Sequence, residues 1–120
     1  MDTNLIVSIS LGLLVLYLAV RFVSGRKTSS VLLGAKIQAG ALILDVRNPA
    51  EFGDGHYSSA VNIPVDQLEK RLPELGDDKS RCIIVYCASG ARAGTASRIL
   101  KQAGFSDVIN AGGLFNMPRE

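Results

Sequence analysis

The stretch CIIVYCASGARA, residues 82–93, carries the clearest structural signal in the chain. Its first five residues are mostly apolar, which predicts a buried strand. Small residues follow Cys87 and predict a tight loop. Residues 92–103 then place their apolar side chains on one helical face, which predicts a helix. A strand, a short loop and a helix in this order are typical of an α/β domain.

The same alternation of strand and helix extends through the rest of residues 31–120. The segment ALILDV, residues 41–46, predicts a second buried strand, and Asn48-Pro49 behind it predicts a turn and a helix start. Strands with continuous apolar runs indicate a parallel sheet covered by helices on both faces. We therefore predict one α/β domain over residues 31–120. Its other expected elements are helices at residues 31–38 and 64–71, a short strand at 107–109, and weaker strand candidates at 60–62 and before residue 31.

Residues 1–30 differ in composition from this domain. Residues 5–23 are almost entirely apolar and, at about 1.5 Å per residue, approach the roughly 30 Å thickness of a membrane core. We expect a transmembrane helix followed by a short polar linker at residues 25–30. A cleaved secretory signal is the alternative, but residues 1–4 contain no Lys or Arg. The basic residues Arg21, Arg26 and Lys27 follow the apolar run, so the positive-inside rule places the C-terminal domain in the cytoplasm.

The charge balance of the chain indicates whether a nucleic-acid partner is to be expected. The chain has 13 Lys and Arg against 11 Asp and Glu, and three of the bases but only one acid lie in residues 1–30. Residues 31–120 are therefore formally neutral. A neutral domain lacks the basic surface typical of nucleic-acid binding, so we expect no nucleic-acid partner.

The two cysteines are not expected to form a disulfide. Cys82 and Cys87 are five residues apart on one strand, so they face opposite sides and their Cα atoms lie about 16 Å apart. Two unpaired thiols suit a reducing compartment, in agreement with the cytoplasmic orientation. His56 is the single histidine, and with two separated cysteines it offers no ordinary ligand spacing for a metal. The sequence does not indicate a nucleotide cofactor either.

Cys87 is the candidate nucleophile. It lies where a strand ends and a helix begins, the edge at which open α/β sheets bind ligands. Amides of small loop residues, the positive end of the helix and the guanidinium of Arg92 would all favour a thiolate. The alternative is a structural cysteine that ends a buried strand. Cys82 lacks these neighbours and is predicted to be a core residue.

Several short motifs in this order resemble the rhodanese-like sulfurtransferases. The resemblance covers nearly all of residues 30–113, and its motifs are Leu44-Asp45-Val46-Arg47, Glu51-Phe52, Gly55-His56, Ala60-Val61-Asn62-Ile63-Pro64, the loop from Cys87 to Arg92, and Ala111-Gly112-Gly113. The resemblance implies a five-stranded parallel sheet and an active-site loop whose amides cradle sulfur. It also implies that Asp45 and Arg47 organise the loops beside the site as a structural ion pair. The position of His56, thirty-one residues before Cys87, predicts a structural turn residue and not a base.

The implied reaction is a double displacement through a cysteine persulfide. Cys87 would take the outer sulfur from thiosulfate or a persulfide and pass it to cyanide or another thiol. The site residues expected to bind the donor are the loop members Ala88, Ser89, Gly90, Ala91 and Arg92. Arg92 would balance the donor's negative charge.

The sequence also departs from the family pattern. Ser59 stands where glycine is frequent, and Phe115 and Met117 stand where a tryptophan is usual. The sequence stops at Glu120, so the last helix is expected to be short or missing, which affects one wall of the cleft.

Two other functions are weighed against sulfur transfer. A cysteine-dependent phosphatase or arsenate reductase would have five residues between cysteine and arginine, whereas this loop has four. A membrane-tethered persulfide carrier or binding module with little turnover is the second alternative. The residues identify no protein partner.

Overall fold

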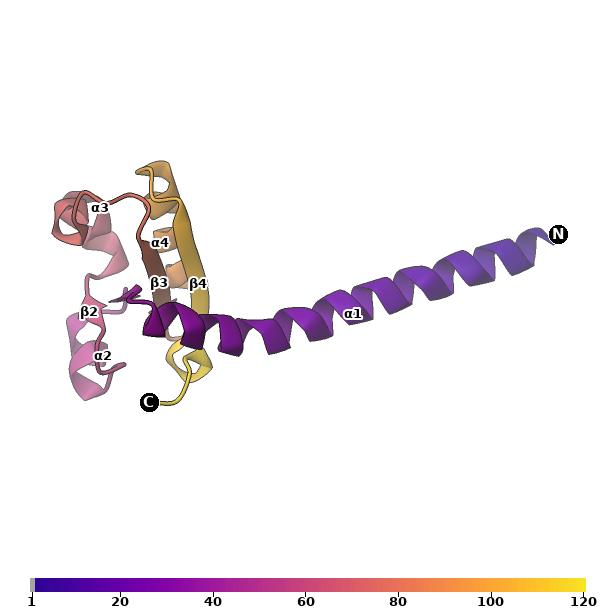
Figure 1. Cartoon of the computed structure of the whole chain (residues 1–120), viewed down its shortest axis with the longest axis horizontal. Coiled ribbons are helices and arrows are strands. Elements are labelled where there is room, and N and C mark those ends of the chain that lie inside the picture. The colour runs from indigo at the N-terminus through magenta and orange to yellow at the C-terminus, as the bar shows by residue number, and fades with distance from the viewer. Residues whose placement is uncertain (1) are drawn as a thin grey trace.

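The computed structural model describes residues 2–120, of which residues 22–29 are described as helical backbone only. Four strands and four α-helices alternate along the chain, with two short 3₁₀ segments between them and a third after the last strand (Figure 1). The helices are α1 (Thr3–Gln38), α2 (Pro49–Asp54), α3 (Leu68–Arg71) and α4 (Ala91–Gln102). The strands are β1 (Leu42–Asp45), β2 (Val61–Asn62), β3 (Cys82–Cys87) and β4 (Asp107–Gly113). The 3₁₀ segments are η1 (Val65–Gln67), η2 (Leu72–Leu75) and η3 (Leu114–Asn116).

The four strands form one parallel sheet in the order β2-β1-β3-β4. This confirms the predicted α/β fold with a parallel sheet. The fifth strand that the family resemblance implied is absent from the described residues, because the segment before residue 31 belongs to helix α1. Strand β4 is longer than predicted. It follows β3 to its carboxyl end, with an irregularity in register opposite Val85 and Tyr86.

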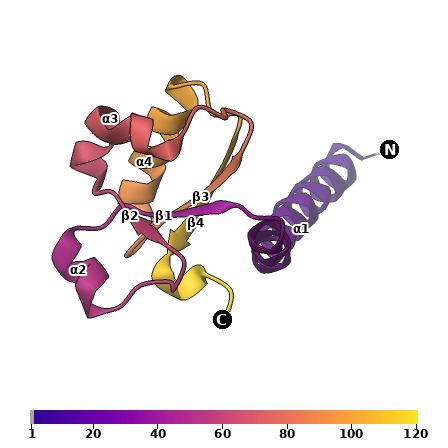
Figure 2. The same cartoon turned by 60° about the vertical axis from the view of Figure 1, so that its left-hand side comes forward.

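The sheet separates two apolar layers. Alternate residues of β3 point to opposite faces: Ile83, Val85 and Cys87 pack in one layer, whereas Ile84 and Tyr86 pack in the other. Figure 2 shows α3 and α4 on one side of the sheet and α1 on the other. Cys82 packs against the second layer, so the two cysteines lie on opposite faces and both are free thiols, as predicted.

Helix α1 is continuous where a linker was expected. Its backbone stays helical through residues 25–30, because the polar side chains there are compatible with a helix and a single glycine costs only about 1 kcal/mol. Its final turns belong to the domain. Leu33 is 1% exposed against the sheet, and Lys36 pairs with Asp107 of β4 at 2.9 Å. The segment Thr3–Arg21 has a mean hydropathy of 2.2, is long and apolar enough to span a membrane, and packs against nothing in the structure.

The helix predicted over residues 64–71 is broken into shorter pieces. It begins as the 3₁₀ segment η1 and becomes α-helical only in α3. The α-helix gives way to η2 at Leu72, next to Pro73, which has no N–H to continue an α-helical ladder. Leu68 is buried, and Val65 and Leu72 are half-buried against the same core, so this segment still turns one apolar side toward the sheet.

Candidate functional site

Cys87 is the last residue of β3, at the carboxyl edge of the sheet. The residue is 1% exposed, and the chain turns after it through Ala88, Ser89 and Gly90 into α4. The turn requires Gly90, whose φ of +107° is unfavourable for residues with a side chain. The sequence therefore places the thiol beneath a tight loop at the start of a twelve-residue helix.

The loop amides act on the thiol. The Gly90 N–H donates to the Cys87 Sγ at 2.9 Å. Burial raises the pKa of the Cys87 thiol, but the backbone N–H groups of Ala93, Gly90, Ser89 and Arg92 outweigh this effect and hold its pKa below the ordinary value. Cys82 shows the opposite balance, because burial and the neighbouring Asp107 raise its pKa. The two thiols of the chain are therefore shifted in opposite directions.

The end of β4 packs directly against the cysteine loop. A Cβ atom added to Gly113 would meet the carbonyl oxygen of Ala88 well inside the 3.0 Å limit of real contacts. A Cβ on Gly90 would lie 3.3 Å from the Cα of Gly112. The paired glycines, seen in the sequence only as part of a family motif, therefore let β4 approach the loop closely.

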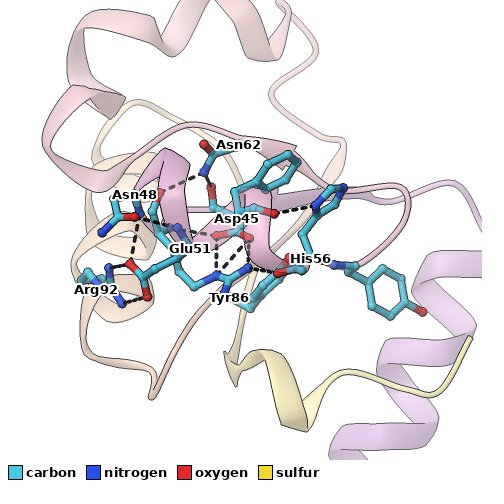
Figure 3. Close-up of polar contacts among 11 residues, drawn as sticks. Asp45, Asn48, Glu51, His56, Asn62, Tyr86 and Arg92 are labelled. Carbon is cyan, nitrogen blue, oxygen red and sulfur yellow. Dashed lines mark hydrogen bonds and ion pairs between the residues drawn. The ribbon is translucent and has the colours of Figure 1, made fainter.

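Arg92 does not stand free beside the thiol. Its guanidinium donates from both terminal nitrogens to the two carboxylate oxygens of Glu51, at 2.6 and 3.0 Å (Figure 3). From the sequence, Arg92 was expected to balance the donor's negative charge, and no role was expected for Glu51. Residue pairs 41 positions apart leave no local pattern, so only the fold brings these two side chains together.

Glu51 is held from the other side by the start of α2. The Asn48 side chain accepts from the Glu51 amide at 2.8 Å, and the Asn48 amide donates to the Glu51 carboxylate at 3.3 Å. This capping box is the sequence signal that could have identified Glu51 as an ordered side chain. The hydrogen bonds from Arg92 lower the pKa of Glu51 to about 2.

Asp45 and Arg47 form the structural ion pair that the resemblance implied. Asp45 is fully buried, and Arg47 donates to its carboxylate from Nε and Nη2 at 2.8–3.1 Å. Arg47 also donates to the carbonyl oxygen of Gly55 at 2.7 Å, which fixes the loop after α2. Asn62 on β2 donates to the carbonyl oxygens of both partners, at 3.0 and 2.9 Å (Figure 3).

His56 has a structural position, as predicted. Its Nδ1 lies 2.8 Å from the carbonyl oxygen of Phe52, and its ring stacks on the Phe52 ring with the centroids 3.6 Å apart. The imidazole therefore packs on the end of α2.

A cleft of about 340 Å³ lies beside the cysteine loop. It extends between α2, the loop after β3 and η3, and it is lined by Arg47, Glu51, Asp54, Gly55, Ala88, Leu114 and Phe115. The wall on that side is the short 3₁₀ segment η3. Phe115 in this wall is 98% exposed.

Comparison with known proteins gives consistent matches over this domain. The family model described as "Rhodanese-like domain" matches residues 30–116. The Bacillus subtilis protein YqhL is 33% identical over 116 residues, which cover 94% of this chain and 90% of that protein. The thiosulfate sulfurtransferase PspE of Escherichia coli is 38% identical over 71 residues, covering 59% of this chain and 68% of PspE.

Solved structures agree with these matches. A rhodanese with anions from E. coli superposes with a TM-score of 0.62 at 36% identity, covering 66% of this chain and 95% of that one. The human single-domain sulfurtransferase TSTD1 superposes with a TM-score of 0.61 at 26% identity, covering 68% and 83%. The sequence relatives also include tRNA uridine(34) hydroxylases, of which the chain spans about a quarter, for example 24% in Sodalis glossinidius.

Proposed function

The chain belongs to the rhodanese-like domain family, and we propose that it is a sulfurtransferase working through a persulfide on Cys87. The observation that carries this proposal is the position of Cys87 at the end of β3, where loop amides lower the pKa of its thiol. A thiolate is the nucleophilic form of cysteine. Its sulfurtransferase relatives at 26–38% identity support the same reaction class.

In the proposed reaction, the Cys87 thiolate attacks the outer sulfur of thiosulfate or of a persulfide. The S–S bond of the donor breaks, and sulfite or a thiolate leaves with the bonding electron pair. The sulfur stays on Cys87 as a persulfide until a thiol or cyanide attacks it and regenerates the thiolate. The amides of Ala88, Ser89, Gly90 and Ala91, together with Arg92, form the proposed sulfur-binding loop.

Intact-mass measurement tests the proposal directly. Protein mixed with thiosulfate or a small persulfide should gain one sulfur atom, and peptide mapping should place it on Cys87. Cys87→Ser should not gain the atom, because a serine hydroxyl cannot form a persulfide, whereas Cys82→Ser should. Unchanged sulfur transfer by Cys87→Ser would contradict the proposal. Steady-state turnover with cyanide separates an enzyme from a carrier that is loaded once and turns over poorly.

The apolar segment Thr3–Arg21 of α1 supports a second part of the proposal, a single-pass tether with the domain of residues 31–120 in the cytoplasm. The full chain should then stay with membranes through carbonate and high-salt washes. Recovery in the wash, or a mature N-terminus beyond residue 21, would contradict the tether and favour a cleaved signal. Protease added outside sealed cells or right-side-out vesicles should leave Cys87-containing peptides intact, and their digestion would reverse the orientation.

A further inference from the structure

Both guanidinium groups beside the cysteine loop are already paired with carboxylates. Arg47 donates to Asp45 and to the Gly55 carbonyl, and Arg92 donates from both terminal nitrogens to Glu51. The remaining charged side chain that lines the cleft is Asp54, which is exposed. Among the described residues, the cleft therefore presents no positive charge that a carboxylate does not already balance.

This arrangement matters for an anionic donor. Bidentate binding of an oxyanion uses two parallel N–H groups of the arginine fork, and Glu51 occupies these with its own two oxygens. With its pKa near 2, Glu51 is ionised over the whole working pH range. A sulfonate group on Arg92 would have to displace this carboxylate or bind the remaining N–H groups of the guanidinium beside it. In either position it would lie close to the Glu51 charge, since the Glu51 side chain is fixed by the capping box of α2.

We propose that Glu51 determines donor specificity, disfavouring doubly charged thiosulfate and leaving the persulfide of a thiol as the preferred sulfur donor. This inference rests on the proposed sulfurtransferase function. Glu51 acts through Arg92 and does not enter the chemical step. It competes for Arg92 with the sulfonate group of thiosulfate, which does not react. A thiol persulfide without carboxylate or sulfonate groups has no such anionic group.

The step with the preferred donor is balanced without any further reactant. The Cys87 thiolate forms a bond to the outer sulfur of the donor R–S–SH, and the S–S bond of the donor breaks. The thiolate R–S⁻ leaves with the electron pair, and the proton stays on the new Cys87 persulfide or passes to the leaving thiolate. One sulfur atom moves and no net oxidation occurs.

Glu51→Gln is the informative substitution. Glutamine fills the same place in a capping box, so α2 keeps its first turn while the charge on Arg92 is released. Glu74→Gln is the matched control, because Glu74 also pairs with an arginine, Arg71 at 2.6 Å, but does not line the cleft. Each variant removes one negative charge from a partly exposed arginine–glutamate ion pair.

The experiment measures the second-order rate constant of sulfur loading on Cys87 by quenched intact-mass analysis, with full-length protein in detergent. The donors are thiosulfate and the persulfide of 2-mercaptoethanol. In Glu51→Gln we expect the ratio of the thiosulfate rate constant to the persulfide rate constant to rise about two- to five-fold, the equivalent of one partly exposed ion pair. Glu74→Gln should leave the ratio unchanged.

The outcomes separate this inference from the function on which it rests. A purely structural role for Glu51 would change the loading rate constants of both donors by the same factor. Loading of Cys87 with an unchanged ratio of the two rate constants would therefore overturn the inference and leave the proposed function standing. Equal ratio changes in Glu51→Gln and Glu74→Gln would also overturn it, as an effect of net charge. Absence of loading in the unsubstituted protein with either donor would overturn both.

Discussion

Gly113→Ala should destabilise the domain through a single contact. The φ of Gly113 is −99°, which any residue adopts, so backbone strain plays no part. The obstacle is the carbonyl oxygen of Ala88, which lies well inside the contact distance of the added methyl group. Backbone atoms cannot rotate away like a side chain. Overpacking of this kind costs about 1–3 kcal/mol.

Gly94→Ala is the matched control at a nearby helical position. A Cβ at Gly94 in α4 would have the side-chain nitrogen of Asn110 as its nearest neighbour, at an ordinary contact distance of 3.7 Å. Replacing glycine by alanine inside a helix stabilises by about 0.5–1 kcal/mol. The same methyl group is therefore expected to have opposite effects at the two positions.

Thermal unfolding distinguishes these cases. For a domain of this size, 1 kcal/mol corresponds to about 4–8 °C in Tm. Gly113→Ala should lower the Tm by at least about 4 °C, whereas Gly94→Ala should raise it by a few degrees, as followed by near-ultraviolet circular dichroism of the buried Tyr86. Because Ala88 belongs to the cysteine loop, Gly113→Ala should also slow alkylation of Cys87. A Gly113→Ala protein as stable and as reactive as the original would refute the close approach of β4 to the loop.

Three further predictions follow from burial and charge. Because the pKa of Cys87 is lowered and that of Cys82 is raised, a small alkylating reagent at pH 6–7 should label Cys87 first. The alkylation rate of Cys87 should level off at a lower pH than the rate of a free thiol. Equal labelling of both cysteines, measured by peptide mass, would argue that Cys87 is an inert thiol. Asp45→Asn removes the fully buried partner of an arginine and should lower the free energy of unfolding by about 3–5 kcal/mol in urea titrations, whereas a loss below about 1 kcal/mol would contradict a buried pair. Leu33→Ala should cost about 2–5 kcal/mol although it lies on the N-terminal helix, while its neighbour Val31→Ala, 77% exposed, should be nearly neutral; equal effects would show that α1 does not pack on the sheet.

The elements around the thiol were predictable because their signals are local. The apolar run of β3, the small residues after Cys87 and the one-sided apolar face of α4 each arise within about a dozen residues. Strand β1 shows the same kind of apolar run, because it is also buried on both faces. The opposite orientation of Cys82 and Cys87 followed from the two-residue period of a strand.

The helix boundaries were less predictable. Polar residues 25–30 suggested a linker, yet α1 continues through them, because polarity does not exclude helix when no strong breaker is present. The packing of Leu33 on the sheet then includes the end of α1 in the domain. The family resemblance implied a fifth strand, and the segment before residue 31 was a candidate for it. In the structure this segment continues helix α1.

Local sequence signals were sufficient for the fold class, the position of Cys87 at a strand end and the separation of the two thiols, because periodicity and small loop residues report local backbone geometry. The surroundings of that cysteine depend instead on tertiary packing. Arg92 meets Glu51, and Gly113 meets Ala88, because the register of parallel strands brings together segments that are far apart in the chain. Contacts of this kind depend on how elements pack, and no single segment contains the information that specifies them.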